Sequence, residues 1–205
     1  MNPSQKEANT KIDMIKKAIE LFKEKGVEPV SVKEICDACS VSRNTFYYYF
    51  VSKDRLFDYI GDYISSSSKE RIVTVLEEQS YYGLLWEYYR AYLLTEIDMG
   101  PDIINHVCLS RTDKGQADTY SYIDEKLAKN MTMIINLAKA NGEIQSTRST
   151  EDLLWVSYAM IRGTNIKWCF QWGASDLIGE SALGMDTLFC PREDLALSPK
   201  YKGQN

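Results

Sequence analysis

Three consecutive tyrosines, Tyr47 to Tyr49, stand between two phenylalanines in the stretch SRNTFYYYFVSK. Arg43 precedes them and Lys53 follows them. A tyrosine ring is rigid, can lie against a thymine methyl group, and carries a hydroxyl that can donate to a phosphate oxygen. Arginine bonds to base edges, preferring guanine, and lysine neutralises phosphates. Together these residue types suit contact with double-stranded DNA.

On a helix at about 100° per residue, Phe46 and Phe50 share one face, and Asn44 and Tyr48 lie opposite it. Thr45 and Tyr47 flank this outer face, and Tyr49 lies at the edge of the phenylalanine face. The spacing predicts a helix over 43–50 with a buried anchor behind and a polar surface in front. The alternative is that the tyrosines are half-buried packing residues in a small helical unit.

Two further helices are predicted before this one. Ile12, Ile15, Ile19 and Phe22 form an apolar stripe on a first helix, which we expect to begin at the cap Thr10 and end at Gly26. SVKE at 31–34 matches a capping box and starts a short second helix. Ser42 caps the third helix after a tight turn. Two short helices joined by such a turn form a helix-turn-helix, whose second helix enters the major groove.

The net charge of −5 would disfavour a nucleic-acid partner if it were spread evenly, but it is not. Residues 1–55 carry 10 Lys and Arg against 8 Asp and Glu, a net charge of +2. The acidic excess therefore lies in the remainder of the chain. Because local charge decides phosphate binding, the acidic total does not exclude DNA.

Helical spacing continues through the rest of the chain, and no segment alternates with the period of a strand. We expect a long helix from Ser52 into the seventies, then helices near 80–98, 101–111, 118–140, 150–172 and 176–189. The prediction is an all-α protein with three domains: a helix-turn-helix domain at 1–55, a helical ligand-binding and dimerisation bundle at 56–190, and a loose polar tail at 191–205.

The run VSVKEICDACSVSRNTFYYYFVSKDRLFDYI resembles the DNA-binding domain of the tetracycline-repressor (TetR) family of bacterial regulators. The resemblance covers about residues 10–60. Ser40 departs from the family pattern, since glycine is usual there, and Asn44 stands where glycine is frequent. The residues that match in register are Ile35, Val41, Ser42, Thr45, Tyr47, Tyr49, Phe50, Lys53, Asp54 and Leu56.

The resemblance implies a role for each residue around the turn. It implies that Ser31, Tyr49 and Lys53 hold phosphates. It places in the major groove Arg43, Asn44, Thr45, Tyr47 and Tyr48. It also implies that the C-terminal helices bind an effector and form a homodimer on a palindromic operator, most commonly as a repressor.

The last two predicted helices carry more apolar residues than one core requires. We expect these helices to pair with their copies in a second subunit, in a two-fold interface. The alternative is that they only close a monomeric bundle. The predicted interface residues are Trp155, Ile161, Trp168, Leu177, Ile178, Ala182 and Met185.

The middle of the chain is rich in aromatic residues, which suits either a core or a pocket for a small hydrophobic or aromatic effector. The pocket candidates are Trp86, Tyr89, Met99, Ile103, Tyr122, Trp155 and Tyr158. Each of them also fits a core position.

Other classes of function find little support in the sequence. The five scattered cysteines indicate reduced thiols, and Cys36 and Cys39 suit packing better than a metal site. His106 near Cys108 lacks a third catalytic group, so we expect no enzyme, cofactor or metal, and a polar role for His106 in the ligand region or on the surface. The polar N-terminus and the absence of long apolar runs predict a cytoplasmic protein without a membrane partner. Two alternatives stay open: a DNA-binding protein of the same fold with an architectural or cell-division role and no effector, and a helical enzyme or carrier.

Overall fold

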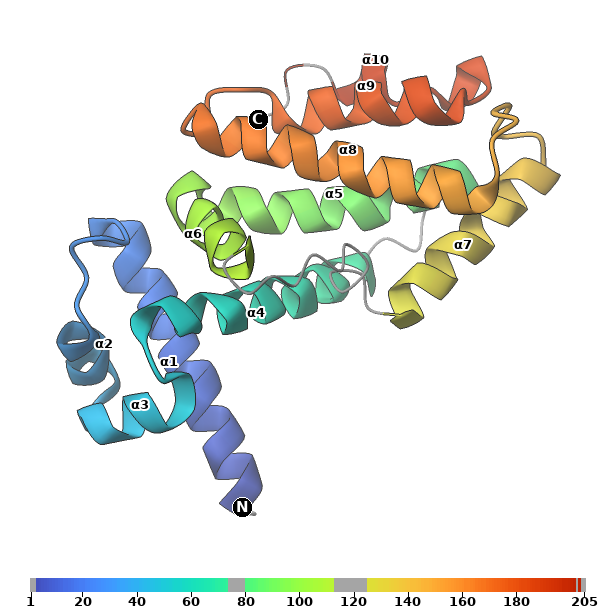
Figure 1. Ribbon diagram of the computed structural model, residues 1–205. Helices are drawn as coiled ribbons and strands as arrows, with labels where there is room; N and C mark the ends of the chain where they lie inside the picture. Colours follow the sequence, from blue (N-terminus) through green and yellow to red (C-terminus); the bar gives the residue numbers. More distant parts are fainter. Residues whose placement is uncertain (1–2, 74–79, 113–124, 202, 204–205) are drawn as a thin grey trace. The chain divides into compact units, whose positions relative to one another are not determined.

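The computed structural model describes residues 3–73, 80–112, 125–201 and 203. Their regular structure is helical, as predicted (Figure 1). The helices are α1 (Pro3–Lys25), α2 (Val32–Cys39), α3 (Arg43–Phe50), α4 (Lys53–Val73), α5 (Tyr81–Met99), α6 (Pro101–Thr112), α7 (Glu125–Ala140), α8 (Thr150–Phe170), α9 (Leu177–Phe189), a 3-10 turn η1 (Glu193–Leu195) and α10 (Ser198–Tyr201).

The predicted helix positions agree with the structure to within a few residues, with one clear exception. Helix α1 begins at Pro3, so Thr10 lies inside the helix and the prediction that it is the N-cap was wrong. Proline is favoured in the first helical turn because its missing N–H would have no partner there. The first part of the helix predicted over 118–140 lies outside the described residues.

The chain divides into two compact units. The first comprises Met1–Ser65 and Asp98–Ala117, and the second comprises Ser66–Ile97 and Asp118–Asn205. The division falls inside α4, after Ser65, and near the end of α5, after Ile97. The boundaries predicted from the sequence, after residues 55 and 190, remain a prediction.

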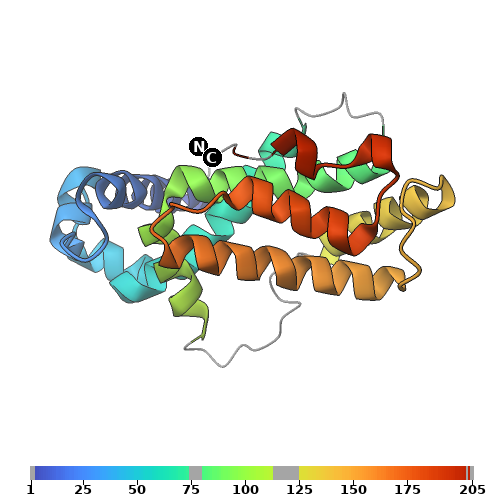
Figure 2. The ribbon, with the colours of Figure 1, turned by 90° about the horizontal axis from the view of Figure 1, so that it is seen from above.

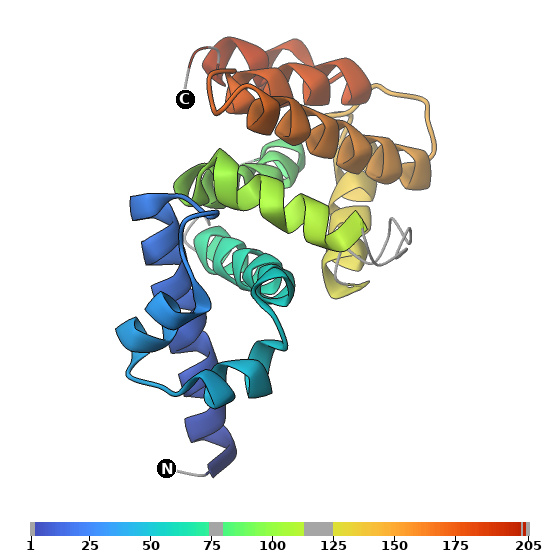
Figure 3. The same ribbon diagram turned by 60° about the vertical axis from the view of Figure 1, so that its left-hand side comes forward.

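In the first unit, α2 and α3 pack beside α1 (Figure 3). Its core is aromatic and aliphatic, with Phe22 stacked on Phe57 at 5.4 Å between ring centroids. Ile35 of α2 is also completely buried. Burial of large side chains is the main force that holds α2 and α3 in place, because helices of eight residues are unstable alone.

In the second unit, α8 and α9 run side by side (Figure 2). The tail after Pro191 is not loose, contrary to our expectation. Leu197 is buried, and the Asp186 carboxylate of α9 accepts the backbone N–H groups of Leu197 and Ser198 at 2.7 to 3.0 Å. The tail is fixed by one buried leucine and by hydrogen bonds to its backbone N–H groups. Its polar composition does not indicate either of these contacts.

Candidate nucleic-acid interface

Helix α2 starts at the capping box that its sequence predicts. The Ser31 side chain accepts the N–H of Glu34 at 3.2 Å, and Glu34 Oε2 accepts the N–H of Ser31 at 2.9 Å. Lys25 Nζ donates to the other Glu34 oxygen at 2.9 Å. The Ser31 N–H first, and then Lys25, lower the pKa of Glu34 from 4.5 to about 2. The box therefore fixes the start of the first helix of the pair.

The turn between α2 and α3 places Ser40 in the left-handed region, with φ at 54°. Glycine adopts this conformation without strain, whereas a residue with a Cβ does not. The departure at Ser40 noted in the sequence therefore has a structural cost. Two residues later, Ser42 caps α3 by accepting the N–H of Thr45 at 3.1 Å.

Helix α3 has the two faces that the spacing predicts. The rings of Phe46 and Phe50 are fully buried, with centroids 5.2 Å apart. Tyr47 is 48% exposed and Tyr48 is 73% exposed. Tyr49 is half-buried, and burial together with the nearby Glu7 carboxylate raises the pKa of its hydroxyl, which keeps it a neutral donor. The tyrosines are thus presented outward from a phenylalanine anchor.

The remaining residues predicted to contact DNA surround these rings. Ser31, Arg43 and Asn44 are exposed. Thr45 is half-buried, and its hydroxyl lies 2.9 Å from the Ser42 hydroxyl. One short helix and its cap therefore bring together the groups predicted for the groove, and their contact with DNA stays a prediction.

Lys53 has partners within the protein. Its ammonium donates to the carbonyl oxygens of Val27 at 2.6 Å and Glu28 at 3.3 Å. An ammonium group has three N–H donors, so a phosphate contact would use the third donor or pull the side chain away from the loop. In the structure, Lys53 therefore holds the loop after α1.

The residues predicted for the dimer interface lie mostly inside the second unit. Trp155 is half-buried, and the other predicted residues are buried in the core of a single chain: Ile161, Trp168, Leu177, Ile178, Ala182 and Met185. Among the described residues of the second unit, the most exposed large apolar side chains are Phe170, at the end of α8, and Trp172, both at 75%. Helical periodicity identified the apolar helices but not which apolar residues face outward.

The predicted pocket residues are divided between the two units. Trp86 and Tyr89 are buried in the second unit, whereas Met99 and Ile103 belong to the first. The Tyr89 hydroxyl lies 2.6 Å from that of Ser157, and burial raises the pKa of Tyr89. Tyr122 lies outside the described residues.

Trp155 and Tyr158, the last two pocket candidates, are half-buried on α8. A groove of about 410 Å³ in the first unit has none of the candidates in its lining, which comes from α1, α2 and the turn after α2: Thr10, Asp13, Met14, Lys16, Lys17, Glu20, Ala38, Cys39 and Val41.

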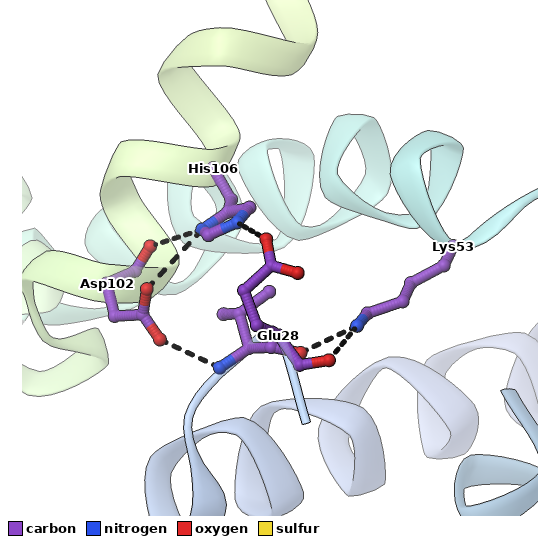
Figure 4. Close-up of polar contacts among 5 residues, drawn as sticks. Glu28, Lys53, Asp102 and His106 are labelled. Carbon is purple, nitrogen blue, oxygen red and sulfur yellow. Dashed lines mark hydrogen bonds and ion pairs between the residues drawn. The ribbon is translucent and has the colours of Figure 1, made fainter. Parts of the chain in front are cut away.

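A polar cluster around the loop after α1 was missed by sequence reasoning (Figure 4). Asp102 Oδ2 of α6 accepts the N–H of Val27 at 2.8 Å, and His106 contacts Glu28. His106 is therefore a partner of this loop, and its predicted place in a ligand region or on the surface stays a prediction. The only signal in the sequence was the spacing of Asp102 and His106, one helical turn apart after Pro101.

No group of three or more metal-ligating side chains occurs among the described residues. The five cysteines are free thiols. In the part of the chain that the structure covers, no helix has the length and apolar character needed to cross a membrane.

Comparison with known proteins bears on both parts of the chain. The fold is similar to that of RolR, whose crystal structure holds resorcinol, with a TM-score of 0.62 and 16% identity over 98% of this chain and 97% of that one. Residues 14–60 match the family model described as bacterial regulatory proteins of the TetR family. The N-terminal region of this chain is thus similar to the corresponding region of bacterial regulatory proteins of the TetR family.

Curated relatives match over less than a third of this chain. The regulator UidR of Escherichia coli is 38% identical over 61 residues, which is 29% of this chain and 31% of UidR. The uncharacterised regulator YuxN of Bacillus subtilis is 36% identical over 62 residues, which is 30% of this chain and 21% of YuxN. The match thus spans about a fifth to a third of these relatives.

Proposed function

We propose that this chain is a ligand-responsive transcriptional regulator of the TetR family, and that it acts as a repressor. As a homodimer it binds a palindromic operator, with one copy of α3 in each of two successive major grooves. The observation that carries this proposal is the division of α3 between buried Phe46 and Phe50 and outward Tyr47 and Tyr48. Rings held rigidly at the surface lose little entropy when they meet a base edge or a phosphate.

The exposed residues before the tyrosines would give DNA binding its sequence specificity. Arg43 and Asn44 open the helix, where the residues nearest the base edges lie in this type of motif. Asn44 bonds preferentially to adenine and Arg43 to guanine. Ser31, Tyr49 and Lys53 supply the backbone contacts that fix the register on the duplex.

A homodimer follows from the symmetry of such an operator. We infer that the exposed apolar side chains of α8, α9 and the turn between them cover one another across a two-fold axis. These side chains are Val156, Ile166, Phe170, Trp172 and Leu183. Their apolar area is large for residues left in water, which favours a partner surface.

We infer that the effector is a small hydrophobic or aromatic molecule bound in the second unit. The aromatic core there includes Trp86 and Tyr89. Polar groups are also buried between α5 and α8, where Asn165 Nδ2 donates to Glu96 and Arg162 lies 3.6 Å from the same carboxylate. A few polar groups in an apolar lining are typical of small-molecule sites. The resorcinol named for RolR makes small phenols the first probes.

The experiment that tests the proposal is selection of bound duplexes from random DNA with the purified full chain. We expect an inverted repeat whose half-site centres lie about one helical turn, or a multiple of it, apart. Recovery of no preferred sequence would contradict the proposal. A reporter driven by the selected operator, exposed to a panel of phenols, then separates an effector-responsive repressor from a DNA-binding protein without an effector.

A further inference from the structure

The short C-terminal helix α10 lays one aromatic side chain, Tyr201, on α5. A helix of four residues is too short to be stable alone, so its place depends on its contacts. It lies beside α9 (Figure 1). Leu197, directly before it, is buried, and the N–H groups of Leu197 and Ser198 donate to the Asp186 carboxylate of α9. The tail is therefore fastened a few residues before its tyrosine.

Tyr201 contacts neighbouring side chains of α5 through its ring and through its hydroxyl. The ring packs on the indole of Trp86, with centroids 5.3 Å apart and an interplanar angle of 51°. The guanidinium carbon of Arg90 lies 5.6 Å from the centroid of the same ring. The hydroxyl donates to Glu87 Oε1 at 3.5 Å. An aromatic platform, a cation at the ring and a carboxylate at the hydroxyl are contacts that a free phenol can also make.

The carboxylate that accepts from this hydroxyl is itself buried. The Glu87 side chain is only 7% exposed, and Arg90 donates to its other oxygen at 3.1 Å. A buried carboxylate is stable only where donors surround it. Tyr201 supplies one of these donors from a terminal segment of the chain. A phenol in solution has the same ring and the same O–H donor, so it can take the place of this side chain.

Two features favour displacement of Tyr201 by a solute. Its hydrogen bond to Glu87 is long, at the limit of such an interaction. Trp86 Nε1 is buried, and among the described residues no acceptor bonds to it, so the tyrosine can leave without breaking a hydrogen bond to the indole. Because the tail is fastened at Leu197 and Ser198, only the segment after them has to move.

We propose that Trp86, Glu87 and Arg90 form a binding site for small phenols, and that Tyr201 occupies this site as an internal ligand. A phenol enters by displacing the Tyr201 ring, packs on Trp86 and donates its O–H to Glu87. The end of the tail is released, and Leu197 stays in place. The site gives the effector of the proposed function a chemical class and a location. Any effect on DNA rests on that proposed function, whereas phenol binding does not.

The size of the effect follows from competition. A tyrosine on the same chain competes with a free phenol at a high effective concentration. An aromatic pair together with a cation at the ring shifts an equilibrium about fivefold to fiftyfold. Removing the Tyr201 ring should therefore increase the affinity for a free phenol by about this factor.

The site is tested with p-cresol, which is the side chain of tyrosine without its backbone. In calorimetric titrations of the full chain, Tyr201→Ala should bind p-cresol about fivefold to fiftyfold more tightly than the wild type. Tyr201→Phe keeps a competing ring and should bind it more weakly than Tyr201→Ala. Tyr63→Ala, which removes a half-buried tyrosine from α4 in the first unit, should match the wild type.

The opposite results are equally clear. Equal affinities of the wild type and Tyr201→Ala, or no binding by either protein, would overturn the proposal. The role of Glu87 is tested with 4-methylanisole, which has the same ring but no O–H. It should bind to Tyr201→Ala more weakly than p-cresol, and equal binding would show that the carboxylate does not recognise the ligand.

Release of the tail is tested by limited digestion of the wild type with trypsin, followed by mass spectrometry. The N–H groups of Lys200 and Tyr201 donate to the Leu197 carbonyl oxygen at 2.8 and 3.2 Å, so cleavage after Lys200 requires this turn to open. We expect saturating p-cresol to accelerate that cleavage about twofold or more. Cleavage after Arg192, which precedes the fastened Leu197, should keep its rate. An unchanged rate after Lys200 would contradict displacement of the tail.

The effect of p-cresol on binding to a duplex selected from random DNA separates this site from the proposed function. If p-cresol binds and releases the tail but leaves the affinity for the duplex unchanged, the site stands and phenol-responsive regulation fails. If another compound changes the affinity and p-cresol does not bind, the site fails and the ligand-responsive function stands.

Discussion

Phe46 and Phe50, one turn apart on α3, pack with their ring centroids 5.2 Å apart and are both fully buried. Tyr48 lies between them in sequence and is 73% exposed. The same eight-residue helix thus has one face that stabilises the fold and another that leaves polar rings in solvent. Substitutions on the two faces should therefore have separable effects.

Phe46→Ala should lower the free energy of unfolding by about 3–5 kcal/mol, because it removes a buried ring and leaves a cavity. Tyr48→Ala should change that free energy by no more than about 0.5 kcal/mol, since its side chain is mostly in water. Urea denaturation of both variants checks the difference. Comparable destabilisation by the two substitutions would show that the tyrosine ring belongs to the core.

The capping box at α2 should make stability depend on pH through Glu34. The pKa of this carboxyl is lowered from 4.5 to about 2, chiefly by the N–H of Ser31. The ionised carboxylate therefore stabilises the folded chain above its ordinary pKa, and that contribution is lost as pH falls toward about 2. Glu34→Gln keeps a capping amide but does not titrate.

Urea unfolding of wild type and Glu34→Gln at about pH 5 and about pH 3 measures this contribution. We expect the wild type to lose more stability than the variant over this interval. Glu24→Gln, which alters an exposed carboxylate outside the box, should retain the wild-type pH dependence. The same loss in Glu34→Gln as in the wild type would contradict the assignment.

Ser40→Gly should stabilise the chain, by up to about 1 kcal/mol. The left-handed conformation at φ 54° costs a residue with a Cβ about 1–2 kcal/mol, and the greater freedom of glycine in the unfolded chain offsets part of the gain. Ser40→Ala keeps the Cβ and should give no gain. Thermal denaturation gives the melting temperatures of the two variants. A lower melting temperature for Ser40→Gly than for Ser40→Ala would contradict the claim that the backbone at Ser40 is strained.

The double variant Phe170→Ser and Trp172→Ser should weaken the proposed dimer by about tenfold or more, because it removes two large rings that are each 75% exposed. Sedimentation equilibrium measures the dissociation constant. Met133→Ser, at a site on α7 that is 55% exposed, is the matched control. A dimer unaffected by the double variant would place the interface on another surface.

The fold and the helix-turn-helix could be predicted from the sequence because each depends on local signals. The capping box at Ser31, the cap at Ser42 and the four-residue spacing of Phe46 and Phe50 are read within one or two helical turns. At Ser40 the resemblance marked a departure from the usual glycine, and the structure places this residue in the left-handed region. These features need no knowledge of distant contacts.

Features that depend on distant contacts could not be predicted. Asp102 binds the N–H of Val27 although the two residues are 75 positions apart. Trp168 and Phe170 are both apolar residues near the end of α8, yet one is buried and the other exposed. Periodicity identifies the apolar side of a helix but not the neighbour that covers it. The packed tail after Pro191 was missed for the same reason.

The most direct test of the account is the affinity of Tyr48→Ala for a duplex selected by the wild-type protein. We expect the variant to retain the helix content and the oligomeric state of the wild type. Its affinity for the duplex should fall at least about tenfold, as expected when a buried contact in an interface is removed. Gel-shift titration at one fixed salt concentration, with circular dichroism of the same samples, gives both quantities. Unchanged affinity in a folded variant would contradict the claim that α3 places its tyrosines on DNA.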